Sequence, residues 1–435
     1  MKALPPSARP RARAPVTLAL AAWALVLMVP PARALRLEEA VSQTLQHNER
    51  ARAADQDALA AAARVSRARA LLLPSLRFDE EWTRLGRGAV LPSRTLGLKG
   101  RLTVQQTLFS ARALPLLSQA RHGREAARLT SAEIRRGLAH ATAGAYLEAL
   151  SAEQVARAAQ RRRGLAVRSL EEIRVRFDAQ LVGSNDVTRA ELEAATAERE
   201  SVRLVGAARV ARLGLENLMG AAASDSLETP TALLELAAQP QTIPAAALAV
   251  AARPDLASAR ERLLALRASA REPLARWVPD LSMTGATSAA EREDMDDVRE
   301  NWSMVLALGW PLFDGGGREA DRAERRALAR SAELQLQGLE RGVAVELESA
   351  RVGLESAQAS LARARVAVEA AGRNAAETAD LYRRGLARAL EVVDANVQLF
   401  EAEVEQVRAQ VALADAFLGL RQAAGLDPIA KESTP

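Results

Sequence analysis

The residues that decide the fold lie near the C-terminal end, where residues 382–395 read YRRGLARALEVVDA. Residues 177–190, FDAQLVGSNDVTRA, repeat this pattern 205 positions earlier. Five pairs coincide under that shift: Phe177 with Tyr382, Leu181 with Leu386, Asp186 with Glu391, Val187 with Val392, and Ala190 with Ala395. A single match of this kind is not enough to exclude chance, so the rest of the chain has to be tested for the same offset.

Other anchors share the offset. LLPSL at 72–76 aligns with WVPDL at 277–281, and Gly220 aligns with Gly425. QTLFS at 106–110 aligns with WPLFD at 310–314 after a one-residue indel. Because several anchors agree, we predict a tandem duplication. The expected division is a first repeat over 35–225, a linker or equatorial segment over 226–243 and a second repeat over 244–430.

The first 34 residues read as a secretory signal peptide. A basic start precedes the apolar run VTLALAAWALVLMV at 16–29, and Ala32 and Ala34 supply an A-x-A cleavage pattern. The run is short for a bilayer span. We therefore expect a cleaved 1–34 segment and an exported chain, with an uncleaved anchor as the alternative.

The charge and the cysteine content of the chain limit the classes of function that it can have. The segment 1–34 holds five of the 59 Lys and Arg residues and none of the 54 Asp and Glu residues, so the remainder is formally neutral. This removes the main support for nucleic-acid binding. With no cysteine, an exported chain gains no stability from disulfides and depends on packing or assembly.

Long helices dominate the predicted architecture. Each repeat is expected to hold a helix, a window of two strands, a helix of about 70 residues and a further helix. The long helices have no internal proline apart from Pro115, which lies in a first turn, where proline is tolerated. At 1.5 Å per residue the long helices would span ~105 Å. The expected helices are 35–71, 111–180 and 184–219 in the first repeat, and 244–276, 315–384 and 388–424 in the second.

Heptad spacing predicts how these helices pack. Leu354, Leu361, Val368, Ala375 and Tyr382 recur every seven residues in the long helix of the second repeat. The following helix alternates apolar residues by four and three, as a coiled-coil seam does. The intervening turn is short, so we expect an antiparallel coiled-coil hairpin.

Two windows, 75–109 and 280–313, alternate apolar and polar residues with period two. Their apolar runs are roughly the 9–11 residues of a tilted outer-membrane strand. Tryptophans gather there, which favours interfacial girdles made of Trp82, Trp302, Trp310 and Phe313. A soluble pair of β-hairpins is the alternative. Polar connections are expected at 86–94 and 288–300.

Four strands cannot close a barrel, and lipid does not tolerate an open sheet edge. If the windows lie in a membrane, the chain must therefore oligomerise with cyclic symmetry. Two copies would give eight strands and three would give twelve; spacing alone leaves this open.

The chain resembles TolC-type outer-membrane efflux proteins. The resemblance covers nearly the whole mature chain and lies in LRLEEAVSQTLQHNE at 35–49, LLPSL, WPLFDGGGRE at 310–319 and YRRGLARALEVVDA. It implies a mainly α fold with a small β part: a homotrimer in which a twelve-strand transmembrane β-barrel continues into an α-helical coiled-coil barrel across the periplasm. It further implies a Gram-negative outer membrane, a periplasmic adaptor (membrane fusion) protein and an inner-membrane transporter.

The same resemblance assigns roles at the helix turns. Glu391 and Asp394 match an acidic pair that rings the periplasmic entrance, and Tyr382 and Asp186 match its latch. A ring of like charges attracts cations. The resemblance also predicts adaptor docking at the tip turns, through Leu181, Gly183, Gly385 and Leu386.

Three points limit these assignments. Gln180 replaces the glycine found at Gly385, and Ala387 stands where some members carry a latch arginine, so Arg384 or Arg388 could serve instead. The alternative reading of Glu391 and Asp394 is a solvated pair near a helix N-terminus, where acids are favoured.

Motifs for catalysis are not found. The three histidines share no metal-ligand spacing with carboxylates, and no P-loop, dinucleotide fingerprint or nucleophile elbow is present. Asp294, Asp296 and Asp297 read as an exposed loop rather than a calcium site. We expect no enzyme activity, no cofactor and no metal.

The leading prediction is a passive outer-membrane duct of a tripartite export system. The alternative is a soluble periplasmic coiled-coil adaptor or scaffold without a pore. Drug efflux, metal efflux and protein secretion, including type I secretion, all remain open as cargo classes.

Overall fold

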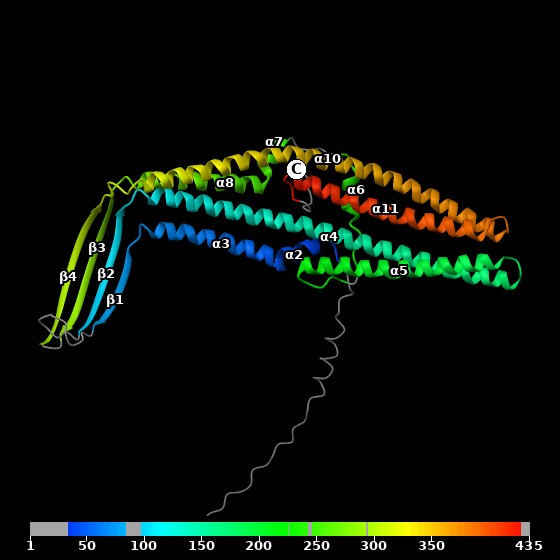
Figure 1. The fold of residues 1–435 in the computed structure, drawn as a ribbon, viewed down its shortest axis with the longest axis horizontal. Helices are drawn as coiled ribbons and strands as arrows, with labels where there is room; N and C mark the ends of the chain where they lie inside the picture. The colour runs from blue at the N-terminus through cyan, green and yellow to red at the C-terminus, as the bar shows by residue number, and fades with distance from the viewer. Residues whose placement is uncertain (1–33, 84–96, 225, 242–245, 293–294, 428–435) are drawn as a thin grey trace, which may run out of the picture.

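A computed structural model describes residues 34–83, 97–224, 226–241, 246–292 and 295–427. The molecule is a long helical body with a four-stranded sheet at one end and two helix turns at the other (Figure 1). Among the described residues, no helix is long and apolar enough to cross a membrane.

The first half contains α2 (Leu37–His47), α3 (Glu49–Ala70), β1 (Ser75–Thr83), β2 (Gly97–Phe109), α4 (Ala113–Asp178) and α5 (Ser184–Met219). The short α6 (Thr231–Ala238) lies in the segment expected to be a linker. The second half contains α7 (Ala246–Ala252), α8 (Pro254–Ser269), α9 (Glu272–Ala275), β3 (Asp280–Arg292), β4 (Met295–Gly309), α10 (Gly317–Arg383) and α11 (Ala389–Ala423).

The structure confirms the predicted fold class, mainly α with a small antiparallel sheet. The sheet order is β1-β2-β3-β4, with every neighbouring pair antiparallel. The helices α4 and α10 have 66 and 67 residues, which corresponds to about 100 Å each.

The connection expected at 288–300 is largely strand. β3 runs to Arg292 and β4 begins at Met295, and the ladder pairs Ala290 with Arg299. The polar sequence suggested a loop, but ladder hydrogen bonds are made by the backbone and do not require apolar side chains. Residues 86–94 and Asp294 lie outside the described residues.

The helix expected at 35–71 is broken at Asn48. The backbone of Asn48 is extended, and its side chain accepts a hydrogen bond from the Arg50 N–H at 2.9 Å. Its amide donates to the Leu218 carbonyl, also at 2.9 Å. Asparagine is a strong N-cap residue, so α3 starts afresh after it.

The helix expected at 244–276 is likewise divided. α8 begins at Pro254, and the preceding Arg253 is extended, as a residue before proline prefers to be. α9 begins beside Pro273. The break at Arg253 lies 205 positions after the break at Asn48, so both halves interrupt their short helices at the same place.

At each break, a glycine packs against the last residue of the short helix. Gly220, after α5, has φ +65° and faces His47, while Gly425, after α11, has φ +79° and faces Ala252. These two pairs are also 205 positions apart. In each half, the helices before the strands and the helix after the long helix therefore lie end to end along the long helix (Figure 1).

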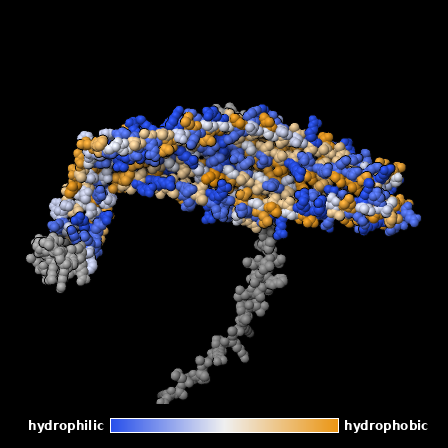
Figure 2. All heavy atoms as spheres, in the orientation of Figure 1, coloured by the Kyte–Doolittle hydropathy of each residue, from blue (hydrophilic) through white to orange (hydrophobic). Residues whose placement is uncertain are grey.

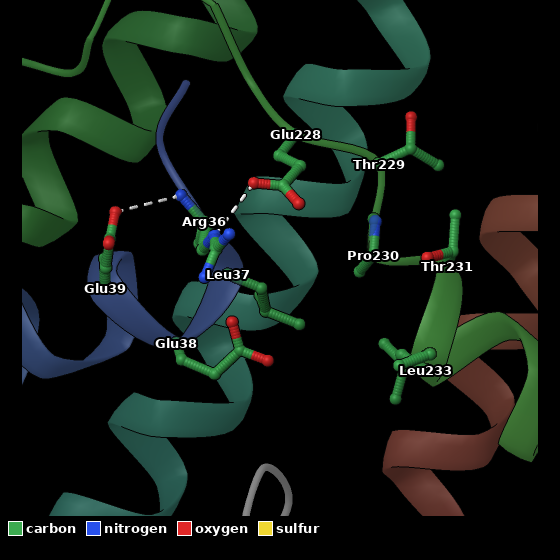
Figure 3. Close-up of a pocket in the computed structure, with 10 residues that line it drawn as sticks. Arg36, Leu37, Glu38, Glu39, Glu228, Thr229, Pro230, Thr231 and Leu233 are labelled. Carbon is green, nitrogen blue, oxygen red and sulfur yellow. Dashed lines mark hydrogen bonds and ion pairs between the residues drawn. The ribbon is translucent and has the colours of Figure 1, made fainter. Parts of the chain in front are cut away.

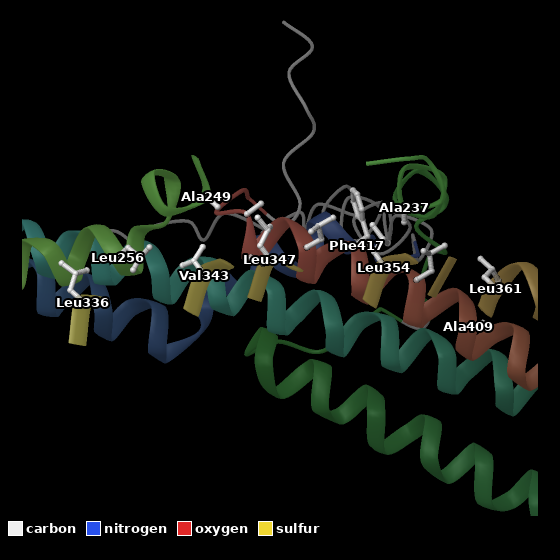
Figure 4. Packing of buried hydrophobic residues seen from close by; sticks show 14 of the residues in the cluster. Ala237, Ala249, Leu256, Leu336, Val343, Leu347, Leu354, Leu361, Ala409 and Phe417 are labelled. Atoms are coloured by element: carbon white, nitrogen blue, oxygen red, sulfur yellow. The ribbon is translucent and has the colours of Figure 1, made fainter. Parts of the chain in front are cut away.

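Most of the predicted heptad positions of α10 are buried, namely Leu354, Leu361, Ala375 and Tyr382, whereas Val368 is half-buried. Leu336, Val343, Leu354 and Leu361 of α10 pack with Phe417 of α11 in one apolar cluster, which α8 also joins (Figure 4). A second cluster lies beneath α2, around the fully buried Tyr146. Apolar and charged residues also share the outer surface of the helical body along its length (Figure 2).

The start of the described chain is held against the segment after α5. Leu35 donates to the Ser226 carbonyl at 2.9 Å and accepts from the Glu228 N–H at 3.0 Å. Arg36 pairs with Glu228 at 2.9 Å, and its backbone N–H reaches Glu39 (Figure 3). These contacts hold the start of α2 against the segment that follows α5.

Candidate functional site: the helix turns and the exposed sheet

The turns between α4 and α5 and between α10 and α11 have the same backbone geometry. Gln180 has φ +59°, the only positive φ among the described non-glycine residues, and Gly385 has φ +76°. The next residue in each turn, Leu181 or Leu386, donates its N–H five residues back at 2.9 Å. These are Schellman-type helix ends. The two turns therefore share individual hydrogen bonds, even though only one of them has a glycine at the left-handed position.

Tyr382 lies in the contact between the two hairpins. It is 7% exposed and clusters with Ile173 of α4, Ala190 of α5 and Ala389 of α11. Its hydroxyl has no hydrogen-bond partner in the described part of the chain. Burial raises the pKa of Tyr382, so the phenol stays protonated at neutral pH.

The ring of Tyr382 is covered by a residue that the sequence did not single out. The guanidinium of Arg176, near the end of α4, lies 4.3 Å from the ring centroid. The same group donates to the Tyr382 carbonyl at 3.4 Å and to Glu172 at 2.8 Å. Nothing in the heptad pattern marks Arg176, because the pattern does not say which hairpin will lie against it.

The predicted acidic residues have different surroundings. Asp186, in the first turn of α5, accepts the Gly183 N–H at 3.4 Å and so caps its own helix. Glu391 and Asp394 are exposed on α11, and neither carboxylate has a hydrogen bond or ion pair in the described part of the chain. Their i, i+3 spacing places both on one helix face.

The structure brings Tyr382 and Asp186 into one neighbourhood but forms no hydrogen bond between them. Arg384 is engaged with Asp380 at 2.7 Å rather than with Tyr382. At the tips themselves, Leu181 and Leu386 are 74% and 73% exposed.

The sheet at the other end has one apolar and one polar face. Directly paired residues of an antiparallel ladder lie on the same face, and the register groups the sets as follows. The mainly apolar face holds Leu76, Phe78, Leu102, Val104, Met283, Trp302, Met304, Leu306 and Leu308, together with Gln106, Thr287, Glu80 and Glu300. The mainly polar face holds Arg77, Asp79, Arg101, Thr103, Gln105, Thr284, Ser288, Asn301 and Ser303, together with Val305.

Nothing in the described chain covers the apolar face. Phe78 is 64% exposed, Trp302 81% and Leu306 65%. Apolar surface on this scale is unusual for a protein in water and marks a contact with lipid or another protein. The strands β1 and β4 form the two edges of the sheet.

The predicted girdle residues lie at different levels. Trp82 pairs with Leu98 toward the end of the sheet away from the helices, whereas Trp302 pairs with Thr287 near the middle of β4. Trp310 and the 86%-exposed Phe313 follow β4 at the helical end, where the Trp310 indole donates to the Trp277 carbonyl at 3.1 Å. Eight residues separate Trp302 from Trp310, or about 26 Å along a strand at ~3.3 Å per residue.

Between sheet and helices lies a buried charged cluster. Glu272 is 1% exposed and pairs with Arg112 and Arg276 at 2.8 Å and with Arg325 at 3.1 Å. Burial alone would raise the pKa of Glu272, but hydrogen bonds from Arg276 and Arg112 outweigh it and the pKa is lowered. The buried Arg318 stacks on Trp277 at 3.9 Å.

In the described residues, no group of three or more His, Cys, Asp or Glu side chains is arranged to hold a metal ion. What the described geometry offers is a pair of surfaces: an uncovered apolar sheet at one end, and turns carrying exposed acids and leucines at the other.

Part of the sequence and most of the fold match known proteins. Residues 245–426 match the family model described as outer membrane efflux protein. The fold is similar to that of the Campylobacter jejuni CmeC outer membrane channel (TM-score 0.78, 15% identity, 91% of this chain and 87% of that one). It is also similar to the outer membrane protein VceC of Vibrio cholerae (TM-score 0.73, 21% identity, 89% and 96%).

A crystal structure of the open state of the Neisseria gonorrhoeae MtrE outer membrane channel is similar as well, with TM-score 0.75, 19% identity and coverage of 90% and 89%. Protein CyaE of Bordetella pertussis is 31% identical over 229 residues, 48% of each chain. The match thus spans about half the length of that curated relative. The second half of the chain thus matches the outer membrane efflux protein family, and the fold is similar to that of solved outer membrane channels.

Proposed function

We propose that this chain is one subunit of a homotrimeric channel that gives substrates passive passage from the periplasm to the exterior. The single observation that carries the proposal is the two-faced sheet at one end of a helical body about 100 Å long. Lipid contact explains the uncovered apolar face around Trp302 and Leu306, and an aqueous lumen explains the polar face around Arg77 and Thr103.

The edges support assembly of several copies. β1 and β4 would leave unpaired backbone groups in lipid, so the edge of one copy is expected to pair with the opposite edge of the next. The helix α10, which follows β4 in the chain, carries Val345, Val352 and Val366, each more than half exposed. Their multiples-of-seven spacing suits a further coiled-coil contact. Three copies would supply twelve strands, the number implied by the family.

At the other end, the turns are proposed as the periplasmic mouth. Glu391 and Asp394, free of partners within the described chain, would form the cation-attracting ring, and Tyr382 and Asp186 would belong to the gate. The exposed Leu181 and Leu386, in turns that also contain Gly183 and Gly385, would contact a periplasmic adaptor protein. An inner-membrane transporter bound to this adaptor would supply the energy for transport.

Expression in a Gram-negative host followed by membrane fractionation tests the proposal. The expected result is a heat-sensitive trimer extracted by detergent from the outer membrane, which forms ion-conducting pores in planar bilayers. Recovery of a monomer in the soluble periplasm, without pore activity, would instead support the scaffold reading.

A further inference from the structure

The contact between the two helix hairpins at the tip is small, and its polar part depends on one residue. The buried residues that join α4 and α5 to α10 and α11 there are Ile173, Ala190, Tyr382 and Ala389. The cation–π contact and carbonyl hydrogen bond of Arg176 to Tyr382 are the described polar contacts between the hairpins at this point. The next ones are near the middle of the hairpins, where Arg161 pairs with Glu403 and Arg162 lies 5.2 Å from the Phe400 ring.

The hydroxyl of Tyr382 adds nothing to this contact. It is buried without a partner, and the nearby Asp186 is used to cap α5. A latch made by the hydroxyl would need a hydrogen bond that the described chain does not contain. The ring and the backbone carbonyl, by contrast, are both engaged by one guanidinium.

Arg176 is well placed to hold the ring. Its ion pair with Glu172, one helical turn earlier on α4, fixes the guanidinium plane over the phenol. A planar cation half-withdrawn from water gains more from an aromatic face than an exposed one does. The contact therefore ties α4 to α10 without any acidic partner on the second hairpin.

We propose that Arg176 is the gate-holding residue of this channel, clamping Tyr382 by its ring and carbonyl so that the two hairpins stay together at the periplasmic mouth. The proposal rests on the proposed channel function and names the residue that regulates the mouth. Opening would separate the guanidinium from the ring and move the α10–α11 hairpin away from α4.

Single-channel recording of the full-length protein in planar bilayers tests this. Arg176→Ala is expected to raise the ratio of open to closed dwell times by about 2- to 30-fold per chain, the range that a cation–π contact of this kind supports. Tyr382→Phe keeps the ring and carbonyl and is expected to leave the ratio unchanged. Tyr382→Leu, which removes the aromatic face, is expected to raise it as Arg176→Ala does.

Arg174→Ala is the matched control. Arg174 lies two residues earlier on α4 and pairs with Glu191 of its own hairpin at 2.7 Å, so its loss should not affect gating. The chain has no cysteine, so Ala190→Cys with Ala389→Cys can be added to Arg176→Ala, and oxidation of this pair across the hairpins should restore closure.

Two results would overturn the clamp. One is unchanged gating in Arg176→Ala when the trimer and its pores are intact, and the other is opening by Tyr382→Phe as strong as by Tyr382→Leu, which would assign the latch to the hydroxyl. Failure of the unsubstituted protein to form pores would contradict the channel function itself and is a separate outcome.

Discussion

Gln180 and Gly385 hold the same left-handed position in two helix turns 205 residues apart, with φ of +59° and +76°. Only one of them is a glycine, so the two turns differ in backbone strain although their hydrogen bonds match. The left-handed region costs an ordinary residue about 1–2 kcal/mol.

We therefore expect Gly385→Ala to destabilise the protein by about 1–2 kcal/mol. No neighbouring atom lies within 4 Å of an added Cβ there, so the whole effect comes from the backbone. Gln180→Gly should be neutral or stabilise by up to about 1 kcal/mol, because the added freedom of the unfolded chain offsets part of the gain. Chemical denaturation followed by circular dichroism measures both; a loss of stability in Gln180→Gly would contradict the strain argument.

The joint at Gly425 is tighter than the equivalent joint at Gly220. A Cβ at Gly425 would lie 3.0 Å from the Ala252 Cβ, while one at Gly220 would lie 3.4 Å from the His47 Cβ. Both glycines have positive φ, so Gly425→Ala should cost about 2–5 kcal/mol and Gly220→Ala about 1–2 kcal/mol. Equal losses in thermal unfolding would show that the close approach to Ala252 is easily relieved.

The buried Glu272 predicts a pH-dependent stability at the junction of sheet and helices. Removing its charge deprives Arg112, Arg276 and Arg325 of a shared partner, although Arg276 and Arg325 still pair with Asp321, so Glu272→Gln should cost about 3 kcal/mol at neutral pH. Because the folded pKa is lowered, this contribution is complete above the unfolded carboxyl pKa of about 4.3 and is lost as the pH falls through the folded value.

Thermal unfolding of Glu272→Gln and the unsubstituted protein should therefore differ most at neutral pH and converge in acid. Glu333→Gln serves as the control, since Glu333 also pairs with two arginines but on the exposed helix surface. A constant difference at all pH values would exclude a charge effect at Glu272.

Substitutions at two neighbouring residues distinguish the two faces of the sheet. Leu306 lies on the apolar face midway between Trp302 and Trp310, and Ala307 lies on the polar face beside Ser282. Leu306→Arg should reduce insertion into phosphatidylcholine vesicles by about 2–4 kcal/mol, the cost of an arginine at the middle of a lipid-facing strand. Ala307→Arg should insert normally, and equal defects would argue against a lipid-facing side.

The proposed acidic ring makes a prediction about block of the channel. Glu391→Gln combined with Asp394→Asn should weaken block by hexamminecobalt(III) in bilayer recordings, because a ring of carboxylates concentrates multivalent cations. Glu171→Gln, which neutralises an exposed acid on α4 near the same end, should leave block unchanged. If block persists in the double variant, the ring lies elsewhere.

The sequence by itself determined the long elements. The helix α10 was predicted to within two residues at each end. The prediction used the absence of internal proline and the seven-residue spacing of Leu354 and Leu361, which are local properties of the sequence. Alternation likewise located the strands, and the 205-residue offset predicted the matching turns at Gln180 and Gly385.

Only the tertiary structure decided the contacts between distant parts. Helix α2 ends at Asn48 because the Asn48 side chain donates a hydrogen bond to the Leu218 carbonyl, 170 residues away. Tyr382 is held by the Arg176 guanidinium over its ring, and its hydroxyl takes no part in the contact. The Glu272 cluster draws its arginines from the start of α4, the end of α9 and the interior of α10. Such contacts depend on which helices become neighbours, and helical period specifies the buried stripe of a helix but not the partner that covers it.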